Sequence, residues 1–329
     1  MMFESMDDCV AFTGHRSYDG AGDAELAAML VRLRAAGRSL FLSGMAMGFD
    51  LAAAEAVLRL RARDGGVRLM AVVPFVGQER AFPTADRRRY DRVLEAADEA
   101  LGDILRQTRK LPLALIVGIP LRHEDRLYNC AAVLAQGRLL GVVPKSYIPD
   151  YAEFYENRWF ASGAGIEQER IMAASQEADF GTELTFAVNG AEFGIEICED
   201  LWVAVPPSSH LALNGAKVIF NLSASPEGAG KHAYLRELVA QQSARTLAAY
   251  VYCSAGFGES STDLVFAGNG LIAENGTMLA EAERFSLDEQ LVVADVDIER
   301  LEFERRRNTS FRMREEAGES TVMPGIWLR

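Results

Sequence analysis

Short apolar runs alternate with stretches of helical periodicity over the first hundred residues. Each run is bounded by glycine, proline or polar residues, and the stretches between carry apolar residues three and four positions apart. Strands that alternate with amphipathic helices form a parallel sheet in the Rossmann manner. The predicted strands are residues 9–16, 39–48 and 67–75, and the predicted helices are residues 24–36, 50–63 and 84–97.

From about Leu101 the pattern changes to longer apolar strands that come in pairs. The dipeptide Asn189-Gly190 separates two of them and is a strong hairpin signal. Mixed sheets covered by helices are expected, and the change of pattern alone places a boundary near residue 100. The predicted strands are 113–121, 127–135, 139–148, 184–198, 217–222, 249–256, 264–273 and 291–298, with a helix over 231–249.

The strand that ends at Cys198 is the most informative segment of this second pattern. Alternation places Ile195 and Ile197 on one face and Glu196 and Cys198 on the other, so the thiol stands where the chain turns. A strand end is a suitable place for a nucleophile. The other interpretation is a small buried apolar residue, which most free cysteines are.

Composition narrows the class of protein. The chain has 329 residues with a formal net charge of −13, which argues against a nucleic-acid or anionic-membrane partner. No apolar run is long enough to span a bilayer, and the first residues lack a signal-peptide pattern. Four cysteines and four histidines show no metal-ligand spacing, so we expect no metal and a reducing, cytoplasmic location.

Three motifs in the first hundred residues follow the predicted strands in order. They are Thr13-Gly14-His15-Arg16, the segment SGMAMGFD over 43–50, and Pro74-Phe75 with Gln78. Glycines at a strand-to-helix turn let the backbone approach a ligand, and the helix start favours phosphate. Together the motifs resemble the SLOG-type Rossmann family, which implies a nucleotide ligand. The residues that the resemblance assigns to its pocket are Gly14, Arg16, Ser43, Gly44, Gly48 and Asp50.

Four later stretches resemble the glutamine-hydrolysing nitrilase-type domain of glutamine-dependent NAD synthetases. They are GVVPKSYIPDYAEFYENRWF, GIEICEDLW, VIFNLSASPEGAGKH and GESSTDLVFAGNGLIAENG, and the likeness covers residues 101–312. The resemblance implies an α-β-β-α sandwich that splits the side-chain amide of glutamine through a cysteine thioester. It implies no cofactor for this step, and a homo-oligomer.

The resemblance also assigns roles to individual residues. Cys198 is the nucleophile, Lys145 stabilises the oxyanion, and Glu156 supports the lysine, with Glu153 as a competitor for that role. A zwitterionic substrate needs a carboxylate for its ammonium group and a cation or hydroxyls for its carboxylate. The implied glutamine-binding residues are Tyr151, Glu199, Trp202, Ser225 and Lys231.

The general-base glutamate of the nitrilase triad is not found before Leu101, so we expect amide hydrolysis to be impaired. Glu79 is a minor candidate for the base, and we expect it to lie far from Cys198. No phosphate loop of a synthetase follows Phe311, so a synthetase would act in trans. The alternatives are a catalytically silent nucleotide- and glutamine-binding module, and a chimeric reading frame without function.

The fold class predicted from all of this is α/β, with a partial Rossmann-like parallel sheet followed by a truncated nitrilase sandwich. The predicted domains are a shortened nucleotide-binding module over residues 1–99 and a glutaminase domain lacking its first strands over residues 100–312. Residues 313–329 form an unassigned tail.

Overall fold

The computed structural model divides the chain into two compact units. The first comprises Met1–Leu101 with Asp150–Phe160, and the second comprises Gly102–Pro149 with Ala161–Arg329. The structure describes residues 9–12, 20–43, 49–71, 84–152, 154, 156–158, 160–256 and 264–312. No helix within these ranges is both long and apolar enough to cross a membrane.

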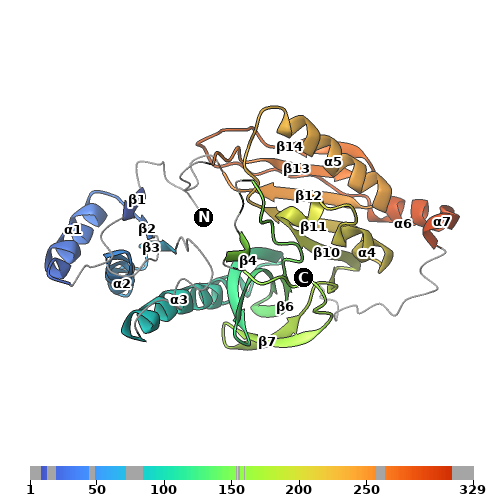
Figure 1. Ribbon diagram of the computed structural model, residues 1–329. Helices are drawn as coiled ribbons and strands as arrows, with labels where there is room; N and C mark the ends of the chain where they lie inside the picture. The colour runs from blue at the N-terminus through green and yellow to red at the C-terminus, as the bar shows by residue number, and fades with distance from the viewer. Residues whose placement is uncertain are drawn as a thin grey trace. The chain divides into compact units, whose positions relative to one another are not determined.

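The first unit contains a three-stranded parallel sheet in the order β1-β2-β3 (Figure 1). Leu30, Phe41 and Val57 join a helix, a strand and a second helix in one buried cluster. The predicted alternation of strand and helix is therefore confirmed over the described part of this unit. Its elements are β1 (Cys9–Phe12), α1 (Asp23–Ala35), β2 (Leu40–Ser43), α2 (Phe49–Arg61) and β3 (Arg68–Ala71).

Helix α3 (Thr84–Thr108) is longer than predicted. The expected end at Ala97 is wrong, because Leu101 and Leu105 continue the apolar stripe at helical spacing and are buried. The change of pattern near residue 100 therefore falls inside a helix. The change to longer apolar strands indicated a new kind of sheet, but it did not indicate where the preceding helix ends.

The second unit contains two sheets. One has five strands in the order β4-β5-β6-β8-β7, and the other has six in the order β14-β13-β12-β11-β10-β9. The first sheet contains β4 (Ala114–His123), β5 (Arg126–Ala135), β6 (Arg138–Pro144), β7 (Glu169–Ala173) and β8 (Gln176–Phe180). The second contains β9 (Thr185–Val188), β10 (Ala191–Ile197), β11 (Val218–Ser223), β12 (Ala249–Ser254), β13 (Gly270–Glu274) and β14 (Thr277–Glu281).

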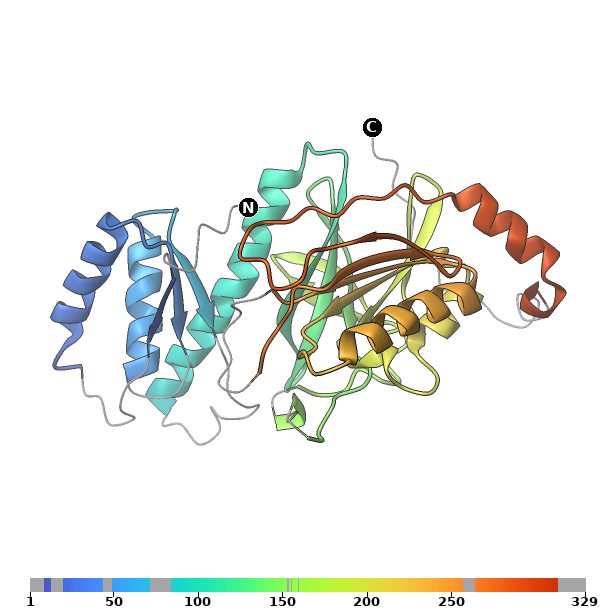
Figure 2. The ribbon, with the colours of Figure 1, turned by 90° about the horizontal axis from the view of Figure 1, so that it is seen from above.

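The two sheets share an apolar core, and helices cover the outer face of the six-stranded sheet. Val133 and Val143 from one sheet and Phe193 and Ile195 from the other belong to a single buried cluster. On the outer face, α4 (Pro207–Leu213) and α5 (Lys231–Thr246) cover the strands, and Figure 2 shows α5 lying along them. Sheet on sheet with helices outside is the layering that the sandwich prediction requires.

Turn chemistry explains several of the strand pairings. Asn189 and Gly190 both adopt positive φ, of 51° and 85°, and join β9 to β10 as an antiparallel hairpin, as predicted. Asn275 and Gly276 do the same between β13 and β14. The sequence analysis did not identify β7, β8, β14, α4, α6 (Ile298–Arg307) or α7 (Thr309–Arg312). The expected strand over 291–298 is wrong: residues 291–297 lie outside any strand, and Leu291 is 89% exposed.

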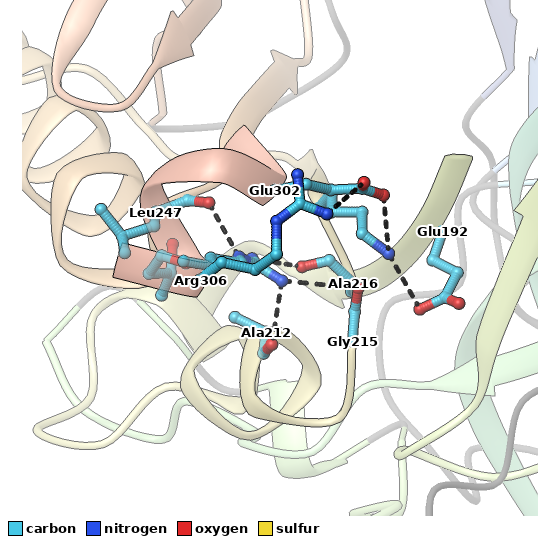
Figure 3. A network of polar contacts seen from close by, with 10 residues as sticks. Glu192, Ala212, Gly215, Ala216, Leu247, Glu302 and Arg306 are labelled. Carbon is cyan, nitrogen blue, oxygen red and sulfur yellow. Dashed lines mark hydrogen bonds and ion pairs between the residues drawn. The ribbon is translucent and has the colours of Figure 1, made fainter. Parts of the chain in front are cut away.

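A buried arginine on α6 (Ile298–Arg307) secures the far ends of both covering helices. The guanidinium of Arg305 donates to the carbonyl oxygens of Ala212, Gly215, Ala216, Thr246 and Leu247, at 2.7 to 3.4 Å. Figure 3 shows these carbonyls converging beside the ion pairs of Glu302. The carbonyls belong to the carboxyl ends of α4 and α5. A positive charge at these ends also interacts favourably with the helix dipoles.

Replacing Arg305 with methionine removes five hydrogen bonds at once from main-chain carbonyls. We expect Arg305→Met to lower the free energy of unfolding by about 3 kcal/mol, measured by urea denaturation. Arg306→Met is the matched control, because the side chain of Arg306 is 68% exposed, and we expect a change within about 0.5 kcal/mol. Equal effects of the two substitutions would contradict this role of Arg305.

Candidate active site

Three parallel strands end at one edge of the six-stranded sheet. β10 pairs with β11, and β11 with β12, all in parallel, so their carboxyl ends meet. Cys198 follows β10 directly, Ser225 follows β11, and Ser254 ends β12. The fold therefore brings two of the predicted site residues, Cys198 and Ser225, to the same edge.

Cys198 has a constrained backbone. Its φ is 50°, which is unusual for a residue other than glycine, and it begins the 3-10 turn η4 (Cys198–Leu201). The predicted alternation is wrong at this residue: Cys198 packs in the cluster between the sheets with Ile195 and Ile197, not on the face of Glu196. The positive φ ends the strand at Ile197, so the alternation does not reach the cysteine. The thiol is 8% exposed.

The carboxylate of Asp200 connects the turn that begins at Cys198 (the cysteine turn) to the turn formed by residues 145–147 (the lysine turn). It accepts the N–H of Ile197 at 2.9 Å, next to Cys198, and the N–H of Tyr147 at 2.7 Å, with the N–H of Ser146 at 3.4 Å. Ser146 and Tyr147 directly follow Lys145, which in turn follows β6. One buried side chain therefore holds together the ends of two strands from different sheets.

Opposing influences act on the pKa of Asp200, and burial outweighs the others. Burial raises the pKa of Asp200 to about 7, the N–H groups of Ile197 and Tyr147 act against this rise, and the charge of Glu196 adds to it. Lys145 favours the ionised form and is only 2% exposed, so a buried cation lies near this carboxylate. The arrangement brings a cation and a thiol to one corner of the unit.

A second polar network lies behind the cysteine. Asn221 accepts the N–H of Cys198 on its side-chain oxygen at 3.1 Å and donates to the hydroxyl of Tyr250 at 3.1 Å. Tyr250 donates to Glu196, whose carboxyl also accepts the N–H of Ser208 at 2.8 Å on α4. Burial raises the pKa of Glu196. The sequence analysis missed this network, although a polar residue inside each of the apolar runs GIEIC and VIFNL was a signal for it.

Two of the predicted glutamine-binding residues of this unit, Lys231 and Trp202, are in contact. The ammonium of Lys231 lies 5.1 Å from the ring centroid of Trp202 and donates to the carbonyl of Pro226 at 2.7 Å. Ser225 is buried at the end of β11. Glu199 follows the cysteine in η4 and is half-buried.

The remaining predicted residues belong to the first unit or lie outside the described residues. Tyr151 is exposed and packs edge-on against Phe154, and Glu156 begins the turn η3 (Glu156–Arg158). Ser43 ends β2 and its hydroxyl donates to the main-chain oxygen of Asp50 at 2.8 Å, at the start of α2. The predicted residues outside the described part are Gly14, Arg16, Gly44, Gly48, Glu79 and Glu153, with the tail 313–329.

A cavity of about 200 Å³ lies beside the lysine turn. Ser146, Tyr147, Thr182, Glu183 and His210 are among its lining residues, whereas Cys198 and Lys145 are not. It is therefore adjacent to the candidate site rather than the cavity of the thiol itself. In the part of the chain that the structure describes, no group of three histidine, cysteine or acidic residues could hold a metal ion.

Comparison with known proteins decides the family. The carbon-nitrogen hydrolase family matches residues 51–306, which is more than half of the chain. The chain belongs to the carbon-nitrogen hydrolase family. Its match takes in Cys198, Lys145 and also residues 51–100, which the sequence analysis had assigned to the Rossmann-like module.

Relatives of this hydrolase chain share a common description. The glutamine-dependent NAD(+) synthetase of Mycobacterium tuberculosis is 48% identical over 224 residues, which are 67% of this chain and 33% of that protein. The protein of the same description from Mycobacterium leprae is 44% identical over 263 residues, 78% of this chain and 38% of that protein. The chain thus spans little more than a third of the length of these curated relatives.

A solved structure supports the fold of this hydrolase. The crystal structure of a glutamine-dependent NAD(+) synthetase from Cytophaga hutchinsonii superposes with a TM-score of 0.56 and 21% sequence identity. The match covers 88% of this chain and 42% of that one. At this identity the likeness concerns the fold alone, and it agrees with the mixed α/β architecture predicted from the sequence.

Asp200 gives the hydrolase a pH-dependent stability with a definite sign. The folded-state pKa of about 7 lies above the ordinary value of 3.8, so the folded state binds the proton more tightly than the unfolded state. The stability advantage of the wild type over Asp200→Asn should therefore shrink as pH rises from about 4 to about 7. Urea denaturation of both proteins over that range measures it. An advantage that grows with pH would mean a lowered pKa and would contradict this account.

Proposed function

We propose that the second unit hydrolyses the side-chain amide of glutamine through a thioester on Cys198. The observation that carries the proposal is the connection through Asp200, which brings the turn of Lys145 to the turn of Cys198. The description of the 48% identical relative as a glutamine-dependent enzyme supports glutamine as the substrate. Attack of the sulfur on the amide carbon forms the C–S bond and places negative charge on the carbonyl oxygen.

Lys145 supplies the positive charge for that oxygen. A buried cation in place before the reaction stabilises developing charge without reorganisation, and such a contact contributes a few kcal/mol to the transition state. Breaking the C–N bond then releases ammonia, which takes up the proton lost by the thiol, and water cleaves the thioester to give glutamate and the free thiol. No proton acceptor for the thiol is assigned among the described residues of this unit, so the proposal keeps the expectation of slow turnover.

Lys231, Trp202, Ser225 and Glu199 are the proposed contacts for the amino-acid end of glutamine. Lys231 already lies over the Trp202 ring, so its charge is positioned before substrate binds. Tyr151 and Glu156 remain proposals that rest on the resemblance alone. The ammonia would be used by a synthetase, which is part of the same proposal.

Nucleotide binding by the first unit also remains a proposal. The buried Ser43 hydroxyl and the start of α2 at the end of a parallel strand support it. Assignment to the SLOG-type family and a reducing, cytoplasmic location stand as proposals on the same footing. The unpaired state of Cys130, Cys198 and Cys253 is compatible with that location.

Ammonia release from L-glutamine tests the proposed reaction. We expect Cys198→Ala to abolish it and Lys145→Met to reduce kcat/KM by about 10²–10³-fold, because the oxyanion loses its cation. Cys253→Ala and Lys110→Met are matched controls at exposed positions and should leave the rate unchanged. Ammonia release that survives Cys198→Ala would refute the proposal, and glutamine binding without any release would favour the silent binding module.

A further inference from the structure

The segment that carries two of the proposed glutamine contacts is not fixed by local helix chemistry. Ser225 lies in the loop 224–230 that follows β11, and Lys231 is the first residue of α5. The N-cap residue Gly230 has a φ of 77° and no side chain to cap the helix, and the first turn contains no acidic residue. Lys231 and His232 instead place basic groups where the helix dipole is unfavourable to them. Contacts with other parts of the fold must therefore hold this segment.

The side-chain amide of Asn269 joins the loop to the start of the helix. Its nitrogen donates to Glu227 at 3.2 Å, and its oxygen accepts from Nδ1 of His232 at 2.9 Å. An ionised carboxylate can only accept hydrogen bonds, so the amide nitrogen faces Glu227 and the amide oxygen faces the ring. Asn269 is 5% exposed. One buried amide therefore links both ends of the segment that carries Ser225 and Lys231.

Both ends of this network are anchored to other parts of the second unit. Nε2 of His232 lies 2.9 Å from the carboxylate of Glu281, the last residue of β14. At the other end, Arg284 contacts the carboxylate of Glu227 at 3.1 Å, and the N–H of Glu227 donates to the carbonyl of Val265 at 2.6 Å. The side chain of Glu227 is 8% exposed, so its charge depends on these partners.

The network reaches the proposed contacts through the chain itself. The ammonium of Lys231 donates to the carbonyl of Pro226 at 2.7 Å and lies 5.1 Å from the centroid of the Trp202 ring. Pro226 directly precedes Glu227, and Lys231 directly precedes His232. The donor and the acceptor of this hydrogen bond are thus each next to a residue that Asn269 holds, and the position of the ammonium depends on that hold.

We propose that Glu227, Asn269 and His232 are positioning residues for glutamine, which hold Lys231 and Ser225 where the amino-acid end of the substrate binds. The inference rests on the proposed function, in which Lys231 and Ser225 contact glutamine. The three residues lie at the loop and at the start of α5, so they act on the affinity for substrate and not on the chemistry at the sulfur.

Steady-state ammonia release by the full-length chain tests the proposal through the separation of KM from kcat. Asn269→Ala removes both hydrogen bonds of the amide, and we expect KM for glutamine to rise about tenfold with kcat within about twofold of wild type. Alkylation of Cys198 by iodoacetamide, followed by mass spectrometry of its peptide, should keep the wild-type rate. A general loss of structure would instead change kcat and the alkylation rate together with KM.

Two substitutions of His232 separate its two contacts. In His232→Asn the amide nitrogen takes the place of Nδ1 and still reaches Asn269, so we expect KM within about twofold of wild type. In His232→Gln the amide nitrogen takes the place of Nε2, the hydrogen bond to Asn269 is lost, and KM should rise as in Asn269→Ala. This pair gives the same test if Asn269→Ala does not fold.

His123→Gln is the matched control. His123 is paired with Glu169 on the five-stranded sheet, and its side chain is 16% exposed, close to the 20% of His232. We expect its KM and kcat to equal those of the wild type. An unchanged KM in both Asn269→Ala and His232→Gln overturns the proposal, as does a fall in kcat at constant KM.

Calorimetric titration of glutamine into Cys198→Ala separates this inference from the proposed function. Adding Asn269→Ala to that variant should weaken glutamine binding about tenfold. If this loss is seen while the wild type releases no ammonia, the proposed reaction is refuted and the positioning role stands. Ammonia release by the wild type with equal glutamine affinity in the two variants would do the reverse. A wild type that neither binds nor hydrolyses glutamine would overturn both.

Discussion

The candidate site depends on one buried carboxylate that serves two turns. Lys145 follows a strand of the five-stranded sheet, and Cys198 follows a strand of the six-stranded sheet. Apolar packing between sheets is non-directional and sets their spacing, but it does not fix the position of one turn against another. Directional hydrogen bonds from Asp200 to both turns supply that constraint.

The rest of the second unit supports this connection from behind. Asn221 accepts the amide of Cys198, Tyr250 links Asn221 to Glu196, and Ser208 joins that network to α4. Arg305 then fixes the far ends of α4 and α5. Polar groups buried in this way stabilise the fold only when every hydrogen-bond partner is present. Substitutions in the hydrogen-bond network that holds the site should therefore also lower the stability of the second unit.

Local sequence signals predicted a tight turn and the position of the cysteine at a strand end, whereas several other strand ends were misplaced. Asn189-Gly190 fixes its hairpin by backbone preference alone, and the run GIEIC located the cysteine at a strand end. The face of Cys198 was not predictable from alternation, because its positive φ ends the strand one residue earlier, at Ile197. The role of Asp200 was equally hidden, since two of its partners, Ser146 and Tyr147, lie more than fifty positions earlier in the chain. The early end assigned to α3 was a missed local signal, because Leu101 and Leu105 continue its apolar stripe at helical spacing.

The most direct test of this account is the rate at which a diazoketone analogue of glutamine labels Cys198 in Asp200→Asn, measured by intact-protein mass spectrometry. That variant keeps both Cys198 and Lys145, but an amide NH2 group replaces one of the two carboxylate oxygens that align them. The account predicts that labelling slows by about tenfold or more in folded protein, because the lysine is no longer held where the carbonyl oxygen binds. Labelling of Asp200→Asn at the wild-type rate would contradict it.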